Sequence, residues 1–317
     1  MSLRLGLFGK LPTASDFVRL EAAAEPFGSF DTWLVSSVEW AHQRGGDPWR
    51  RAFASGCSYA FVYRAPAPRR LSPLLVGVLG PSADRAGRQF PLSVAVPYPV
   101  AGESLACPEL LPIVFEPLWH KASDVVAEGS AGVAIESHLG LFEFEPCALP
   151  EAGASYQDWI TNLPPRALWE LLYGEDYGEQ PEYVLRLLTE ALRPYRQMER
   201  PKTPLTLWLP LGRVAGASVC VWLDLVRRLA GWQATLPSFF WSHDGSDGRL
   251  LLHLGDPPPC TVAELWLPNP ERNEIVDLAS PVDPVQLTRL PPLSAEVAAA
   301  SLNAPSVAEL LALLVAG

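Results

Sequence analysis

The sequence predicts an α/β protein with mixed, partly antiparallel β-sheets flanked by helices, organised as two α/β domains. Its 317 residues are enough for about two domains of ordinary size. Hydrophobic residues make up 49% of the chain and charged residues 19%, a composition that excludes an intrinsically disordered protein. In the first half, closely spaced apolar runs favour hairpin-like neighbours, whereas in the second half strand and helix patterns alternate.

The N-terminal region predicts one strand and one amphipathic helix. Residues 3–9 alternate apolar with small or polar side chains, as a strand does. Residues 29–43 carry apolar side chains at helical spacing, and we expect Ser29 or Asp31 to cap this helix. The helix is expected to end before Gly45-Gly46.

Three strands and a broken helix are predicted next. The strand patterns are separated by a proline-rich turn and a polar loop, and they lie at residues 58–64, 74–80 and 90–96. Strands this close in sequence usually pair antiparallel. A helix over residues 109–128 contains Pro112 and Pro117, which predicts two short pieces or a kink.

The best candidate for a linker follows at residues 147–155. This segment loses the apolar periodicity and gains small residues. We therefore place the domain boundary here, with one domain over residues 1–148 and a C-terminal α/β domain over residues 149–317.

The second half predicts an alternation of helices and strands. The expected elements are a helix beginning at Pro181, a strand over 206–211, a helix over 218–231 capped by Ser218, and a hairpin of 239–241 with 250–254. The last helix begins with a capping box, in which Ser306 is followed three residues later by Glu309.

Charge and hydropathy exclude several classes of partner. The net charge of −11 argues against nucleic acid or an anionic membrane as the main partner, because both require a net basic face. The longest apolar runs are far shorter than the ~20 residues of a membrane span, so we expect no membrane insertion. The N-terminus lacks the pattern of a secretory signal, which makes the cytoplasm the expected location.

Metal, cofactor and enzyme signatures are absent from the sequence. No two of the five cysteines form a CxxC pair, and the histidines show no HxxxH, HxH or HExxH spacing. GxSxG, GxxxxGK[ST] and GxGxxG are also missing, so we expect no metal, no cofactor and no enzymatic activity. Ser242-His243-Asp244 is unlike a working triad, because neighbours on a strand point to opposite faces. Residues 244–248 fit a hairpin turn better than a calcium loop.

The densest polar segment lies between two of the apolar strand patterns. Arg85, Arg88 and the hydroxyl of Ser82 can present hydrogen-bond donors to a carboxylate or a phosphate. Alternatively, Asp84 and Ser82 cap the turn and one arginine pairs with a nearby acid such as Asp16.

The charge of the chain is unevenly distributed. Residues 1–90 contain 11 arginines or lysines against 7 acidic residues, a net charge of +4 within a chain of net charge −11. A basic patch that faces an acidic or phosphorylated partner is one interpretation of this asymmetry, and a solvated surface is the other.

Two long motifs in the first hundred residues resemble the signatures of a known family. They are LFGKLPTASDFVR at residues 7–19, followed by DTWL at 31–34, and GVLGPSADRAGRQFPL at 77–92. The motifs are similar to those of the type VI secretion system-associated proteins called TagF or ImpM. The likeness covers residues 1 to about 100, fades towards residue 145 and is loose in the second half.

The resemblance implies a function and a set of residues. Members of this family are cytoplasmic accessory proteins that restrain the contractile secretion machine after translation, by binding a forkhead-associated scaffold protein or another component of the system. In several bacteria they are linked to a threonine kinase and phosphatase pathway. The partner-binding residues that the motifs suggest are Asp16, Arg19, Ser82, Asp84, Arg85 and Arg88. The same side chains can instead form a buried network that builds the fold.

An enzymatic function is the alternative. A hydrolase would use Ser82 or Cys57 as its nucleophile, and it would need a titratable group within hydrogen-bond reach of one of them.

Overall fold

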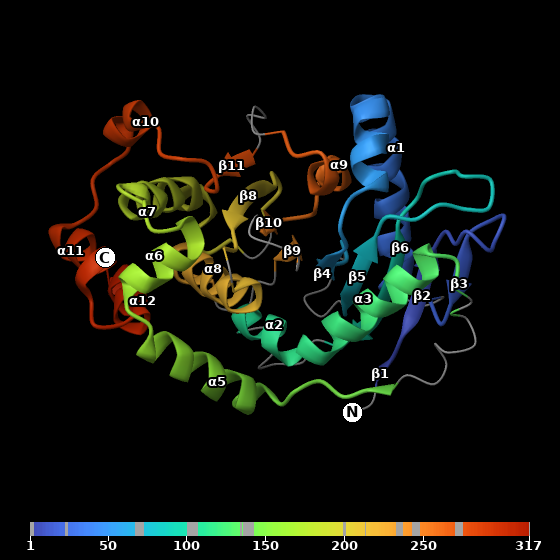
Figure 1. Ribbon diagram of the computed structural model, residues 1–317. Helices are drawn as coiled ribbons and strands as arrows, with labels where there is room; N and C mark the ends of the chain where they lie inside the picture. The colour runs from blue at the N-terminus through green and yellow to red at the C-terminus, as the bar shows by residue number, and fades with distance from the viewer. Residues whose placement is uncertain are drawn as a thin grey trace.

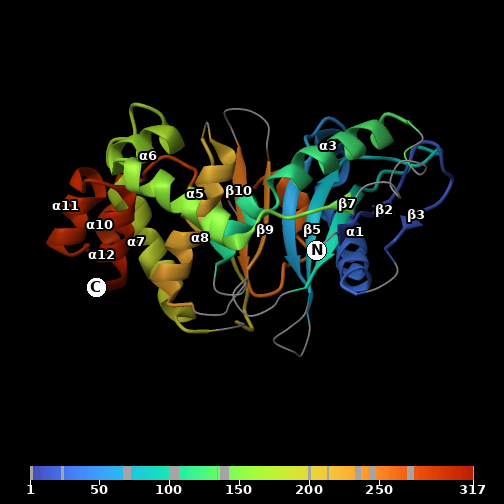
Figure 2. The same ribbon diagram turned by 90° about the horizontal axis from the view of Figure 1, so that it is seen from below.

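The structure is a computed structural model of the whole chain (Figures 1 and 2). The residues that it describes are 3–22, 25–66, 73–99, 107–133, 135, 143–198, 201–212, 214–232, 237–242, 248–269 and 275–316.

A twisted sheet forms the centre of the molecule. Within the described ranges it has nine strands in the order β11-β8-β10-β9-β4-β5-β6-β2-β3. Their bounds are β2 (Gly6–Gly9), β3 (Val18–Leu20), β4 (Tyr59–Arg64), β5 (Leu74–Gly80), β6 (Leu92–Tyr98), β8 (Leu205–Pro210), β9 (Ser238–Ser242), β10 (Arg249–Leu254) and β11 (Ile275–Asp277). Neighbouring strands are antiparallel except β11, which is parallel to β8. β1 (Leu3–Arg4) and β7 (Glu143–Phe144) form a separate antiparallel pair.

Helices surround this sheet and also form a layer at one end of it (Figure 2). Their bounds are α1 (Phe27–Ala54), α2 (Leu111–Val114), α3 (Glu116–Ser130), α5 (Leu149–Asn162), α6 (Pro165–Tyr173), α7 (Gln180–Leu192), α8 (Ala215–Ala230), α9 (Thr261–Trp266), α10 (Pro284–Arg289), α11 (Ala295–Asn303) and α12 (Val307–Ala316). Short 3-10 turns lie at η2 (Pro108–Leu110) and η3 (Arg193–Tyr195). The predicted mixed α/β class with a partly antiparallel sheet is confirmed.

The sheet has an apolar core on each face because alternate strand residues point to opposite sides. Phe61 and Tyr63 of β4 pack with α1, where the Phe61 ring stacks on Phe30 with centroids 4.9 Å apart. Ala60 and Val62 point to the other face, in the core that contains α2, α3 and α8. Figure 2 shows α1 and α3 on opposite sides of the strands.

The two halves of the chain share the sheet. β4, from the first half, pairs antiparallel with β9, from the second, and Ala60 lies opposite Trp241. The boundary at residues 148 and 149 stays a prediction about folding units. The linker expected at 147–155 is wrong, because α5 begins at Leu149 and buries a stripe that small neighbouring residues obscure in the sequence: Ala152, Tyr156 and Ile160.

The predicted helix over residues 29–43 is part of a longer one. α1 begins at Phe27 without a side-chain cap, because Phe27 and Phe30 extend its buried stripe towards the N-terminus; Ser29 instead donates to the Glu25 carboxylate. The backbone does break at Gly46, where φ is 53°. Beyond the break the chain turns helical again, since Trp49 and Phe53 are buried against the core.

Several other predicted helices and strands are present where we expected them, but their first or last residues differ from the prediction. α8 begins at Ala215, so Ser218 is a buried residue within the helix and does not cap it. α12 does receive the predicted cap, since the Ser306 hydroxyl accepts the N–H of Glu309 at 3.3 Å. The antiparallel order of β4, β5 and β6 and the broken helix at α2 and α3 are confirmed. Among the described residues, no helix combines the length and the apolar character that crossing a membrane requires.

Candidate functional site

The two sequence motifs meet at the loop between β5 and β6. The N–H of Arg85 donates to the carbonyl of Ala14 at 2.8 Å, and the Ser82 hydroxyl donates to the carbonyl of Lys10 at 2.8 Å. Across the loop itself, the N–H of Phe90 donates to the carbonyl of Ser82 at 3.0 Å. Segments that lie more than seventy positions apart in the chain are therefore held together by one backbone hydrogen bond and one from the Ser82 side chain.

Asp84 organises the turn at the tip of this loop. One of its carboxylate oxygens accepts the N–H groups of Ala86 and Arg88, at 3.0 and 2.9 Å. Gly87 adopts a φ of 78°, a conformation that residues with a side chain rarely adopt, and donates its N–H to the carbonyl of Asp84. The acid thus caps its own turn, as one of the two interpretations of the sequence expects.

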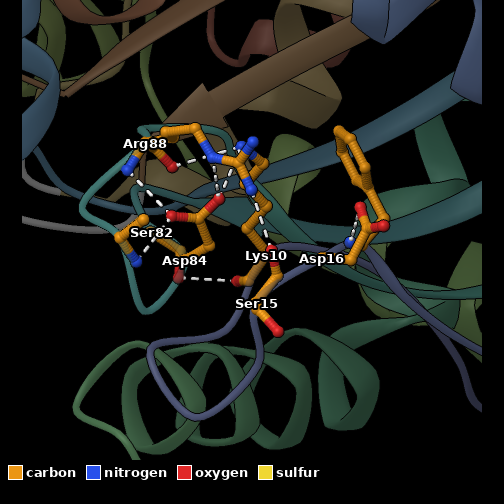
Figure 3. A network of polar contacts seen from close by, with 8 residues as sticks. Lys10, Ser15, Asp16, Ser82, Asp84 and Arg88 are labelled. Carbon is orange, nitrogen blue, oxygen red and sulfur yellow. Dashed lines mark hydrogen bonds and ion pairs between the residues drawn. The ribbon is translucent and has the colours of Figure 1, made fainter.

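The same carboxylate pairs with two cations (Figure 3). Its second oxygen lies 3.0 Å from Nζ of Lys10 and 2.7 Å from Nε of Arg88, and the Asp84 side chain has no exposed surface. The guanidinium of Arg88 also donates to the carbonyl of Ser15 at 2.8 Å. Asp84 is therefore a buried charge that is fully compensated, as buried charges must be.

The environment of Asp84 keeps it ionised. Burial alone would raise the pKa of the carboxyl, but the N–H of Arg88 and the side chains of Lys10 and Arg88 outweigh burial and hold this pKa well below its usual range. Protonation of this group therefore plays no part near neutral pH.

The remaining predicted residues lie around this network and not in it. Asp16 is exposed, and its carboxylate accepts the N–H of Phe17 at 2.8 Å, turned away from Asp84 (Figure 3). Arg19 pairs with Asp31 and lies over the ring of Phe8, 5.2 Å from its centroid. The sequence predicted that one arginine pairs with a nearby acid such as Asp16. In the structure this arginine is Arg88, and the acid with which it pairs is Asp84.

Two residues of the site were not singled out from the sequence. Lys10 is 8% exposed and holds Asp84, while Phe17 is 44% exposed. The Phe17 ring packs on Phe8 and Phe90, with centroids 5.8 and 4.8 Å away. Their place inside the first motif was the available signal, since Lys10 and Phe17 both belong to the run at residues 7–19.

The two candidate nucleophiles, Ser82 and Cys57, are each engaged with a neighbouring group. Ser82 is buried, and its hydroxyl donates a hydrogen bond to the Lys10 carbonyl. Near Cys57, burial raises the pKa of the Tyr59 hydroxyl far above its usual range, and this hydroxyl donates to the carbonyl of Leu265. His243 and Asp244 lie outside the described residues, as does most of the turn at 244–248.

Two cavities of the molecule lie away from the loop between β5 and β6. A cavity of about 460 Å³ is lined by Trp119, Trp159 and Trp241, and another of similar size is lined by residues of the segment 170–180. Neither includes a residue of the two motifs. Within the described ranges, no three His, Cys, Asp or Glu side chains converge as metal ligands do.

One comparison with known proteins, the match to a family model, agrees with the motifs. Residues 6–139 match the family of TagF N-terminal domains, described as type VI secretion system-associated. A solved structure, that of PA0076 from Pseudomonas aeruginosa PAO1, has 20% sequence identity to this chain, covers 88% of it and 98% of its own length, and gives a TM-score of 0.49. A search of curated proteins gave no match. The match to the TagF N-terminal domain family thus covers the region that contains both motifs, which is less than half of the chain.

Proposed function

We propose that this chain is a non-catalytic, cytoplasmic regulator of a type VI secretion system, which restrains the machine after translation by binding its forkhead-associated scaffold protein. One observation carries the proposal. The two TagF motifs fold onto each other around Asp84 and present one surface, with Phe17, Arg19, Arg85 and Arg88 exposed on it.

The geometry of this surface supports binding more than chemistry. The acid that a catalytic site would need, Asp84, is enclosed and fully paired, so it does not receive or release protons near neutral pH. The groups that remain accessible are guanidinium groups and an aromatic ring, which are residue types enriched in protein interfaces.

A secretion assay tests this function in the bacterium that encodes the chain. Deleting the gene should raise release of the secreted tube protein while the transcripts of the secretion cluster stay constant, because the restraint acts on assembled components. Expressing the chain from a plasmid should reverse the effect. Unchanged secretion in the deletion strain, measured under conditions in which the apparatus is produced, would contradict the proposal.

A further inference from the structure

The motif surface divides into an inner network and an outer rim. The network contains Lys10, Ser82 and Asp84, each less than a tenth exposed. The rim contains Phe17 and Arg85, which are exposed. We call these two residues the docking pair.

Phe17 is held in place although it is exposed. Its ring rests edge-on against Phe90 and is stacked on Phe8, both of which are buried. Nζ of Lys10 lies 5.2 Å from the centroid of the same ring. A rigid aromatic ring that needs little ordering on binding is an effective anchor for a partner side chain.

Arg85 offers a charge that the described part of the chain does not neutralise. Lys10 and Arg88 share Asp84, and Arg19 is paired with Asp31, whereas Arg85 makes no ion pair among the described residues. Its backbone is nevertheless fixed, because its N–H donates to the carbonyl of Ala14 at 2.8 Å. The guanidinium therefore extends from a rigid turn with its donors available.

The two members of the docking pair are neighbours. Ala14, which holds the backbone of Arg85, is three positions before Phe17. Lys10 also links them, since its Nζ contacts the Phe17 ring and lies 3.0 Å from the carboxylate of Asp84, the residue next to Arg85. The apolar anchor and the guanidinium are thus carried by two segments that meet at this loop.

This pairing defines the chemistry of the partner. We propose that the docking pair receives a short unphosphorylated segment of the scaffold in which an Asp or Glu lies beside an aromatic or aliphatic side chain. The carboxylate pairs with the Arg85 fork, and the apolar side chain packs on Phe17. The inference rests on the proposed function, and it adds which residues of the surface make contact and what they recognise.

Binding kinetics of variants test this assignment. The full-length chain is immobilised, and the purified scaffold is passed over it at low and at high salt. Arg85→Ala should weaken binding about tenfold at low salt and reduce its salt dependence, because one screened charge pair is lost. Phe17→Ser should weaken binding about tenfold with the salt dependence retained, because an apolar contact is lost.

Matched controls come from the other end of the molecule. Arg193→Ala removes an exposed arginine of η3, and Val285→Ser removes an apolar side chain of α10 that is 56% exposed. Both should leave the affinity within about twofold of wild type. The melting temperature of each variant is measured alongside, and Phe17→Leu, which keeps an apolar side chain, should recover part of the affinity if Phe17→Ser lowers that temperature.

The outcomes separate the inference from the function on which it rests. If wild type binds and both docking-pair variants behave like the controls, the docking pair is wrong while the proposed function stands. If wild type does not bind, both fall. If treating the scaffold with a phosphatase abolishes binding, the ligand is a phosphate and the carboxylate assignment is overturned.

Discussion

At the scale of single residues, the site combines a buried acid with accessible cations. Asp84 accepts two N–H groups and pairs with Lys10 and Arg88, so it determines the shape of the loop. The sequence alone could predict that Ser82 and Asp84 cap a turn, because such residues favour turns. It could not predict that Lys10 would be the buried partner, because that contact depends on the pairing of β2 with β6.

Variants of Asp84 and Arg85 distinguish a residue that stabilises the fold from one that only binds the partner. Asp84→Asn should lower the melting temperature and the partner affinity together, since Lys10 loses its counter-charge in a buried position. Arg85→Ala should lower the affinity alone. Differential scanning calorimetry beside a binding assay checks this, and a normal melting temperature for Asp84→Asn would show that the network is dispensable.

The difference in the free energy of unfolding between wild type and Asp84→Asn should depend on pH. The pKa of Asp84 is lower in the folded chain than in the unfolded chain, so its contribution to stability is complete above about pH 4, the usual pKa of an unfolded aspartate. It is lost as the pH falls further. Unfolding free energies measured from pH 6 to pH 2 should therefore converge for wild type and Asp84→Asn at the acid end.

At the scale of elements, buried charges join the helices of the second half to the segment before α2. Glu109 of η2 lies 3.1 Å from Arg227 of α8, which also pairs with Asp224 at 2.8 Å. The Tyr156 hydroxyl of α5 donates to Asp224 at 3.1 Å.

The sequence predicted α8 from its apolar spacing, but it did not predict α5, whose apolar stripe is hidden by small residues. β3 was missed because three residues carry too little pattern.

Glu109 should make the protein less stable as the pH rises. Burial raises the pKa of its carboxyl to about 7, an effect that Asp224 reinforces and Arg227 opposes. Between about pH 4.5 and 7 the unfolded chain has released this proton and the folded chain has not, so this group lowers the free energy of unfolding by roughly 1.4 kcal/mol per pH unit.

The variant Glu109→Gln isolates this effect. Its free energy of unfolding minus that of wild type should increase from pH 5 to pH 8, because only wild type has to hold a buried carboxylate at the higher pH. Urea titrations at several pH values give this difference. A difference that is constant over the range would mean that Glu109 is ionised throughout.

At the scale of the whole molecule, one sheet unites the region that matches the TagF N-terminal domain family with a second half that this match does not reach. β4 and β9 were each predicted from local patterns, whereas the pairing that joins them was not, because the central residues of both strands are apolar and do not specify their neighbour. The core beneath α1 is therefore built by residues from both halves of the chain.

Because both halves of the chain share one sheet, we expect their unfolding to be cooperative. The full chain should unfold in one transition, because separating the halves would expose the buried edges of β4 and β9. Calorimetry of the full chain tests this, with the van't Hoff enthalpy expected to equal the calorimetric one. Two resolved transitions would instead favour the predicted folding units at residues 1–148 and 149–317.

The most direct test of the central claim is a calorimetric titration of the full-length chain with the forkhead-associated scaffold protein of its own secretion cluster. We expect a saturable heat of binding, and we expect Arg85→Ala to weaken binding while its melting temperature stays at the wild-type value. No measurable heat from the wild-type chain at high concentrations of scaffold would contradict the claim that the motif surface is built to bind this partner.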